Sequence, residues 1–301
     1  MNCNFIGVYP AVTTKFNSND EVDYDACMKG VQAQLDAGVH GIILGGTLGE
    51  ASTLTAQEKK ILLETTVKYV DGKIPVVLNI AEQTTKDAIN VAHTAKASGA
   101  SGLMLLPPMR YASDDRETVT YFKAIAAATD LPIMIYNNPV DYKVEVTMDM
   151  FEQLKECQTI KAVKETTRKI SNVTKMKTRF GDRFKIMCGL DTLGCEALMM
   201  GADGWVAGLV CAFPKETVAI YELVKQNRNA EAIEIYRWFL PLLELDINTK
   251  LVQNIKLAET AIGLGNEYVR EPRLPLYGTE RDNVQAIIDT GIKNRPTLPA
   301  L

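Results

Sequence analysis

The stretch Ile160–Thr167 places a lysine, Lys164, at the end of a short apolar run that is typical of a buried strand. Side chains alternate between the two faces of a strand, so Ile160, Ala162 and Lys164 are expected to share one face. An ammonium group at the mouth of a buried site loses hydration, which lowers the pKa of the lysine and favours the neutral, nucleophilic amine. Such an amine forms an imine with a 2-oxo acid. The alternative is a strand-end lysine whose ammonium group reaches solvent.

A tyrosine, Tyr136, ends another apolar run, in the sequence Tyr136-Asn137-Asn138-Pro139. Taken alone, Tyr136 fits a core aromatic with a hydrated hydroxyl group. If its strand precedes that of Lys164 in the same sheet, the phenol lies beside the amine and can transfer protons during imine formation. We therefore predict that Lys164 and Tyr136 are catalytic.

A third stretch, Gly45–Glu50, is a turn rich in small residues. Gly46, Thr47 and Leu48 form its centre, where backbone N–H groups and the Thr47 hydroxyl can bind an anion. The turn matches neither of the common nucleotide-binding patterns, so a carboxylate is the better ligand, and an ordinary tight turn is the alternative. Further along, Gly189 and the strand that contains Val206 would let a substrate approach the backbone closely.

A repeated local pattern indicates how these residues are positioned. An apolar helical run, Gly-x-x-Gly and an apolar strand follow one another at residues 38–44, 99–105 and 201–207, and proline begins the apolar runs at 75 and 132. Glycine ends the helices in this pattern, and proline is tolerated as a first strand residue. The expected strands are Gly7–Val12, Gly41–Leu44, Pro75–Asn79, Gly102–Leu106, Pro132–Tyr136, Ile160–Lys164, Lys185–Cys188 and Gly204–Ala207.

Eight strands that alternate with helices predict an α/β fold, a (β/α)₈ TIM barrel, whose functional residues lie at the carboxyl ends of the strands. Residues 1–225 are expected to form this barrel and the site. Residues 226–301 are expected to form a C-terminal helical extension of the same domain, with helices at 229–245, 249–262 and 280–290.

Composition narrows the function classes. The 301 residues are 47% hydrophobic with a net charge of −4, so no basic surface is expected for nucleic acid, and no apolar run approaches the roughly 18 residues of a membrane span. The first seven residues lack a basic segment followed by an apolar core, so we expect no signal peptide and a cytoplasmic protein. The six cysteines show no paired spacing, which predicts reduced thiols. Two isolated histidines do not make a zinc motif, so we expect no metal.

The motifs together resemble those of the dihydrodipicolinate synthase/N-acetylneuraminate lyase superfamily. The resemblance rests on Gly46-Thr47-x-Gly49-Glu50, Tyr136-Asn137-x-Pro139 and Val163-Lys164-Glu165, and it covers nearly the whole chain. It implies a cofactor-free, metal-independent Schiff-base lyase, usually a homotetramer, that acts on a small 2-oxo acid. By motif position, Lys164 would form the imine, Tyr136 would transfer protons and Thr47 would bind the carboxylate.

Three positions depart from the synthase pattern. Leu48 replaces a second threonine, Pro108-Met109-Arg110 replaces a loop with a relay tyrosine, and Asp141 replaces an arginine that would bind the aldehyde's carboxylate. The chain is also similar to 1-pyrroline-4-hydroxy-2-carboxylate deaminases, in the Tyr136 motif and in the tail segments 256–259 and 272–276. These departures favour the deaminase reaction, with Arg110 and Asp141 among the substrate-binding residues. The alternatives are the synthase or another pyruvate-dependent aldolase, and a non-catalytic sensor of a 2-oxo acid.

Overall fold

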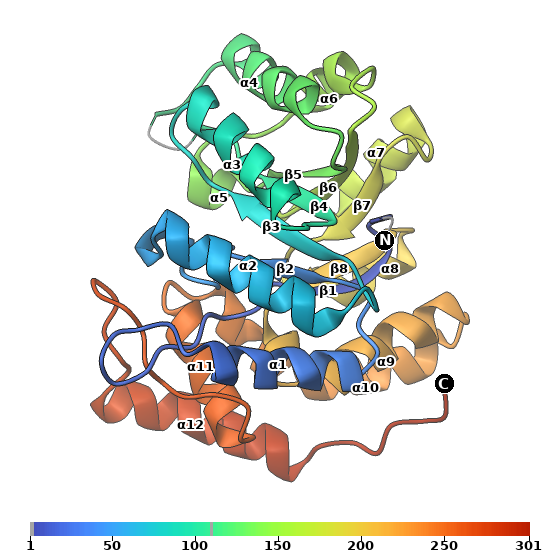
Figure 1. Cartoon of the computed structure of the whole chain (residues 1–301). Helices are drawn as coiled ribbons and strands as arrows, with labels where there is room; N and C mark the ends of the chain where they lie inside the picture. The colour runs from blue at the N-terminus through green and yellow to red at the C-terminus, as the bar shows by residue number, and fades with distance from the viewer. Residues whose placement is uncertain (1–2, 109–110) are drawn as a thin grey trace.

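Eight short parallel strands form the centre of the computed structural model, which describes residues 3–108 and 111–301 (Figure 1). Hydrogen-bonded neighbours run in the order β1-β8-β7-β6-β5-β4-β3-β2. An isolated bridge between Ala11 and Ile43 joins the two ends of this order, with the Val12 amide donating to the Ile43 carbonyl at 3.1 Å. The sheet therefore closes on itself, and the predicted (β/α)₈ barrel is confirmed. The strands are β1 Gly7–Pro10, β2 Ile42–Leu44, β3 Val76–Ile80, β4 Gly102–Leu105, β5 Ile133–Asn137, β6 Ile160–Glu165, β7 Lys185–Cys188 and β8 Gly204–Ala207.

Helices surround the strands and carry the expected terminal signals. The sequences Thr55–Glu58 and Thr84–Asp87 both predict a capping box at a helix start. Thr55 begins α2 with a reciprocal capping box to Glu58, so the first prediction is confirmed. At the start of α3 the carboxylate of Asp87 accepts only from the Thr84 hydroxyl, so the second is wrong. Gly38 and Gly99 both have positive φ, as required just after a helix. The barrel helices are α1 Tyr24–Asp36, α2 Ala56–Val70, α3 Thr85–Ala97, α4 Asp115–Ala128, α5 Pro139–Tyr142, α6 Met148–Leu154, α7 Ser171–Phe180, α8 Gly194–Met199 and α9 Pro214–Lys225.

The strand that carries Lys164 differs from the expected alternation at its first residue. Ile160 packs in the outer core between strands and helices, whereas Ala162 packs inside the barrel. The pairing register of β6 against β5 shifts between Ile160 and Ala162, so Lys161 is an extra residue and alternation is interrupted there. The prediction of one continuous inward row is therefore wrong at Ile160, while Ala162 and Lys164 do share a face.

The chain after residue 225, called the C-terminal extension below, lies on one side of the barrel beside α1 (Figure 1). Its helices are α10 Asn229–Leu243, α11 Leu251–Ala261 and α12 Gly278–Lys293. The helix expected over 229–245 ends at Leu243, and a short 3₁₀ helix, η4 Glu244–Ile247, follows. This break turns the chain towards the barrel mouth. Across the described residues, no helix combines the length and apolar character needed to span a membrane.

Candidate active site

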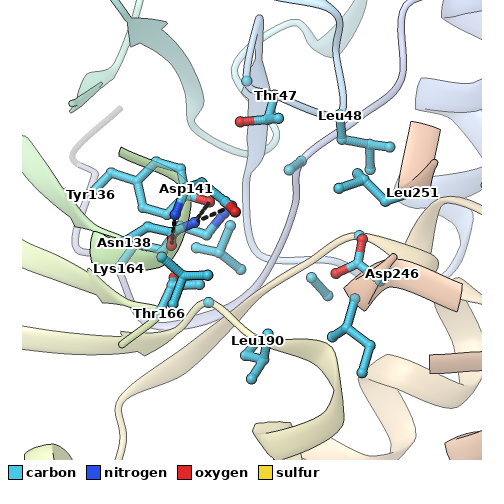
Figure 2. Close-up of a pocket in the computed structure, with 18 of the residues that line it drawn as sticks. Thr47, Leu48, Tyr136, Asn138, Asp141, Lys164, Thr166, Leu190, Asp246 and Leu251 are labelled. Carbon is cyan, nitrogen blue, oxygen red and sulfur yellow. Dashed lines mark hydrogen bonds between the residues drawn. The ribbon is translucent and has the colours of Figure 1, made fainter. Parts of the chain in front are cut away.

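A cavity of about 450 Å³ opens at the carboxyl ends of the strands, and Lys164 lies at its base (Figure 2). Only 7% of Lys164 is exposed, and its Nζ atom lies 4.1 Å from the centre of the Tyr136 ring. Burial lowers the pKa of Lys164, while the nearby carboxyl groups of Asp246 and Asp191 act in the opposite direction. The side chain is therefore placed where a larger fraction of neutral amine is available than on an exposed lysine.

Tyr136 pairs with Lys164 across strands β5 and β6, as their sequence positions predicted. The phenol oxygen accepts a hydrogen bond from Nδ2 of Asn138 at 3.2 Å, and the same nitrogen donates to Oδ2 of Asp141 at 2.7 Å. Burial raises the pKa of Tyr136, so the phenol keeps its proton near neutral pH. The side chain is held as a neutral group that can both donate and accept a proton.

A second tyrosine, Tyr142, completes a hydroxyl cluster that the motifs did not reveal. Its ring packs edge-on against that of Tyr136, with centroids 5.5 Å apart and an interplanar angle of 76°. The Tyr142 hydroxyl is hydrogen-bonded to the Thr47 hydroxyl. Tyr142 ends the short helix α5, one residue after Asp141, so its spacing from Pro139 is the sequence signal that could have identified it.

Residues 45–49, called the glycine loop below, meet the predicted strand-end residues at this cavity, which is lined by Gly46, Thr47, Leu48, Gly189 and Val206. Gly189 has a specific steric reason to be glycine. A Cβ atom there would lie 2.0 Å from the Thr166 hydroxyl and 2.6 Å from Cγ of Lys164. The space beside Gly189, where we expected a substrate to lie close to the backbone, is filled by the side chain of Lys164.

Asp141 and Arg110 are the other two predicted binding residues. Asp141 lies in the cavity wall, where its carboxylate accepts the hydrogen bond from Asn138. Arg110 lies outside the described residues. Of the residues that the structure describes, Arg168 brings a guanidinium group to the cavity, from the loop after β6, in a left-handed conformation with φ of 63°. Arg168 was not expected at the site, because a non-glycine residue gives no sequence signal of positive φ.

Two aspartates near Lys164 have different surroundings. Asp191 is buried and accepts hydrogen bonds from Nε1 of Trp205 at 3.0 Å and from the backbone amides of Gly208 and Leu209. These bonds fix the end of β8 against β7. Both carboxylate oxygens of Asp191 therefore already have hydrogen-bond donors within the protein. Asp246 comes instead from η4 in the C-terminal extension and faces the cavity (Figure 2). Its distance from the barrel motifs in sequence explains why it was missed.

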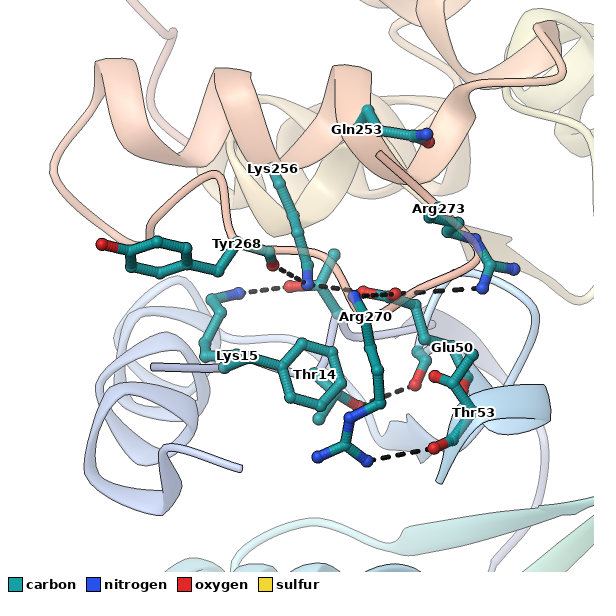
Figure 3. A network of polar contacts seen from close by, with 12 residues as sticks. Thr14, Lys15, Glu50, Thr53, Gln253, Lys256, Tyr268, Arg270 and Arg273 are labelled. Atoms are coloured by element: carbon teal, nitrogen blue, oxygen red, sulfur yellow. Dashed lines mark hydrogen bonds and ion pairs between the residues drawn. The ribbon is translucent and has the colours of Figure 1, made fainter. Parts of the chain in front are cut away.

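The glycine loop is fixed from behind by buried ion pairs with the C-terminal extension (Figure 3). Nζ of Lys256 donates to Glu50 at 2.5 Å and to the Tyr268 carbonyl at 2.6 Å, and both charged side chains are fully buried. Beside them, Nζ of Lys15 pairs with Glu259 at 2.6 Å. Glu50 directly follows the glycine loop with φ of 56°, so this network determines where the loop lies.

Within residues 3–108 and 111–301, no three His, Cys, Asp or Glu side chains are arranged to hold a metal ion. The cavity contains one desolvated amine, the Arg168 guanidinium, the Tyr136 phenol, hydroxyl groups and carboxyl groups, and the Tyr142 ring packs against Tyr136. A closed parallel barrel with a buried lysine at its carboxyl mouth defines the class of TIM-barrel enzymes in which a lysine can act as nucleophile.

Comparison with known proteins identifies the family. Residues 4–290 match the model of the dihydrodipicolinate synthetase family, and the chain belongs to that family. A 4-hydroxy-tetrahydrodipicolinate synthase of Exiguobacterium sibiricum is 32% identical over 272 residues, covering 90% of this chain and 92% of the relative. One of Staphylococcus haemolyticus is 32% identical over 274 residues, with 90% and 92% covered.

Solved structures show the same architecture. The dihydrodipicolinate synthase of Aquifex aeolicus superposes with a TM-score of 0.91 at 27% identity, covering 95% of this chain and 97% of that one. A dihydrodipicolinate synthase of Bacillus anthracis superposes with a TM-score of 0.92 at 27% identity, with 99% and 100% covered. These relatives are lyases, and the chain is an enzyme of that kind with a small-molecule substrate.

Removing the charge of Lys256 tests the buried network. We expect Lys256→Met to lower the free energy of unfolding by about 3–5 kcal/mol, because it leaves the buried Glu50 carboxylate with only the Arg270 amide and a longer contact to Arg273, at 3.8 Å. Adding Glu50→Gln should recover part of that loss. Lys60→Met, which breaks the exposed pair with Glu64, is the matched control and should cost less than about 1 kcal/mol. Urea unfolding measures all four proteins, and equal costs for both lysines would contradict this account.

Proposed function

We propose that the protein is a lyase that activates a 2-oxo acid as an imine of Lys164. The observation that carries the proposal is the burial of this amine at the barrel mouth, 4.1 Å from the Tyr136 ring centre, with a lowered pKa. Family membership supports it, because the motif positions of Lys164 and Tyr136 are those that the resemblance assigned to imine formation and proton transfer. The reaction needs neither metal nor cofactor in this proposal.

The chemical steps follow from the groups present. The neutral amine of Lys164 attacks C2 of the 2-oxo acid, and the resulting carbinolamine loses water to give an iminium ion. The positive nitrogen acidifies the C3–H bond, and loss of that proton gives an enamine. The enamine carbon then bonds to the carbonyl carbon of an aldehyde, whose oxygen takes up a proton. Water hydrolyses the new imine and releases the product, so one water is lost and one is consumed.

The hydroxyl cluster is suited to move the protons. Tyr136 lies beside the amine, and Tyr142 links its ring to the Thr47 hydroxyl of the glycine loop. The synthase pattern has a relay tyrosine in the loop that corresponds to residues 108–110, and this sequence has no tyrosine there. We propose that Tyr142 takes that function from helix α5. The carboxylate of the 2-oxo acid would then bind to Thr47 and the backbone amides of the glycine loop.

The comparisons favour the synthase branch over the deaminase reaction expected from the sequence. The relatives described above bear the names of synthases, and none bears the name of a deaminase. Pyruvate with an aldehyde is therefore our leading proposal for the substrates. The deaminase remains a second candidate because Asp141 occupies the place of the arginine that a carboxylate-bearing aldehyde would need, and Asp141 faces the same cavity. A homotetramer in the cytoplasm stays a prediction from the family resemblance.

Trapping with borohydride tests the imine. With pyruvate present, reduction should add mass to the peptide that contains Lys164, and Lys164→Ala should abolish both the adduct and the activity. The rate of trapping should rise with pH to a midpoint below 10.5, the ordinary pKa of lysine, because burial lowers the pKa. Lys161→Ala, in the exposed neighbour on the same strand, is the control and should keep the adduct. An adduct on another lysine would refute the proposal.

Two conservative variants test the hydroxyl cluster. Tyr136→Phe and Tyr142→Phe should each lower kcat by about 10²–10⁴-fold, the usual contribution of a general acid or base, with circular dichroism unchanged. Tyr277→Phe, at a tyrosine that is 79% exposed, serves as the control and should leave kcat unaltered. A kcat within about threefold of the parent for Tyr142→Phe would restrict proton transfer to Tyr136.

A direct comparison of substrates decides between the two reactions. We expect the condensation of pyruvate with an aldehyde to have a higher kcat/KM than the release of ammonia from 4-hydroxy-1-pyrroline-2-carboxylate. The condensation is measured by the consumption of pyruvate. Both assays use the same enzyme preparation, and the Lys164→Ala variant gives the background of each. Efficient ammonia release without condensation would reverse the order of the two candidates.

A further inference from the structure

Asp246 is the one carboxylate-bearing residue that the C-terminal extension contributes to the cavity wall. It belongs to η4, which interrupts the run of helix between α10 and α11 at the barrel mouth. Within the described part of the chain, its carboxyl group has neither a hydrogen-bond donor nor an ion-pair partner, in contrast to Asp191 and Asp141. A polar group that faces a cavity without a protein partner is placed to bind a ligand.

Gly208 leaves the space that the Asp246 carboxyl group occupies. A Cβ atom on Gly208, at the end of β8, would lie 2.4 Å from Oδ1 of Asp246, so only glycine leaves room for the carboxyl group. Figure 2 shows Asp246 on the side of the cavity away from Tyr136 and Asn138, with Leu251 and Leu190 near it. The C-terminal extension also brings Asn248 and Thr249 to the cavity wall, and Asp246 is the acidic residue among those that it contributes.

We propose that Asp246 determines the second substrate by binding a hydroxyl group of the aldehyde, so that the enzyme prefers a neutral hydroxyaldehyde to an aldehyde with a carboxylate. This inference rests on the proposed imine of Lys164, which places the 2-oxo acid on the side of Tyr136 and the glycine loop. The aldehyde must then approach from the remaining side, where Asp246 lies.

The hydrogen-bonding properties of a hydroxyl group and of a carboxylate support the preference for a neutral hydroxyaldehyde. A hydroxyl group both donates and accepts hydrogen bonds, so it matches a carboxyl group in either protonation state. A carboxylate only accepts, and it would be added to a cavity that already contains Asp246 and Asp141. Burial and the neighbouring Asp191 already raise the pKa of Asp246, which is the effect of unfavourable negative charge at this place. Another anion would increase that cost.

The test is a ratio of two specificities, measured on the same enzyme with the same pyruvate. The aldehydes are glyceraldehyde, which is neutral and hydroxylated, and succinate semialdehyde, which carries a carboxylate. Any effect of a variant on imine formation is common to both aldehydes and cancels in the ratio of their kcat/KM values. We expect the parent to prefer glyceraldehyde, and Asp246→Asn to reduce the ratio by about 10- to 100-fold, the usual worth of hydrogen bonds to charged groups.

Two further variants make the result specific. Gly208→Ala keeps the carboxyl group but displaces it from the cavity, and it should reduce the ratio in the same direction. Glu244→Gln changes the same charge at an exposed position of η4, outside the cavity, and should leave the ratio and both activities as in the parent.

Three results would contradict the assignment of Asp246 or the imine of Lys164. An unchanged ratio in Asp246→Asn, with the borohydride adduct present on Lys164, would refute the assignment of Asp246 and leave the proposed function standing. If the parent enzyme prefers succinate semialdehyde and the Arg168→Gln variant does not, the assignment of Asp246 is also refuted. Arg168 would then be the residue that binds the carboxylate of the aldehyde. Absence of the adduct from the parent protein would refute the proposed function and the inference together.

Discussion

The burial of one lysine is the constraint on which the site depends. Lys164 is 7% exposed, and desolvation disfavours its charged form. A barrel provides this environment because eight strand ends converge on one mouth, so an inward side chain at the end of β6 has neighbours on every side. The carboxyl groups of Asp246 and Asp191 limit the decrease in pKa, so the amine is desolvated without being isolated from compensating charge.

Much of this arrangement could be predicted from short-range sequence patterns. Gly-x-x-Gly segments, prolines at strand starts and alternating apolar runs gave all eight strands, because each signal reflects a local backbone requirement. The pairing of Lys164 with Tyr136 followed from their positions at the ends of adjacent strands. The register shift at Ile160 was not predictable, because a bulge depends on pairing with β5 rather than on the residues of β6 alone.

The residues that were missed are those whose position depends on tertiary contacts. Tyr142 reaches Thr47 from the end of the short helix α5, so its spacing from Pro139 identifies it only once that helix is known. Asp246 reaches the cavity from the 3₁₀ helix η4, far in sequence from the barrel motifs, and no local pattern marks it. Arg168 adopts a left-handed conformation that its residue type disfavours. In each case long-range packing overrides the local preference.

The same long-range contacts connect the extension to the chemistry. Lys256 and Glu259 in α11 form the buried ion pairs that fix Glu50 and Lys15 behind the glycine loop, while Asp246, a few residues earlier, faces the cavity. One segment thus positions the loop that would bind the 2-oxo acid and also supplies the group that would meet the aldehyde. Because a barrel alone leaves the mouth open, variation in this segment can change the second substrate without altering the strand that carries Lys164.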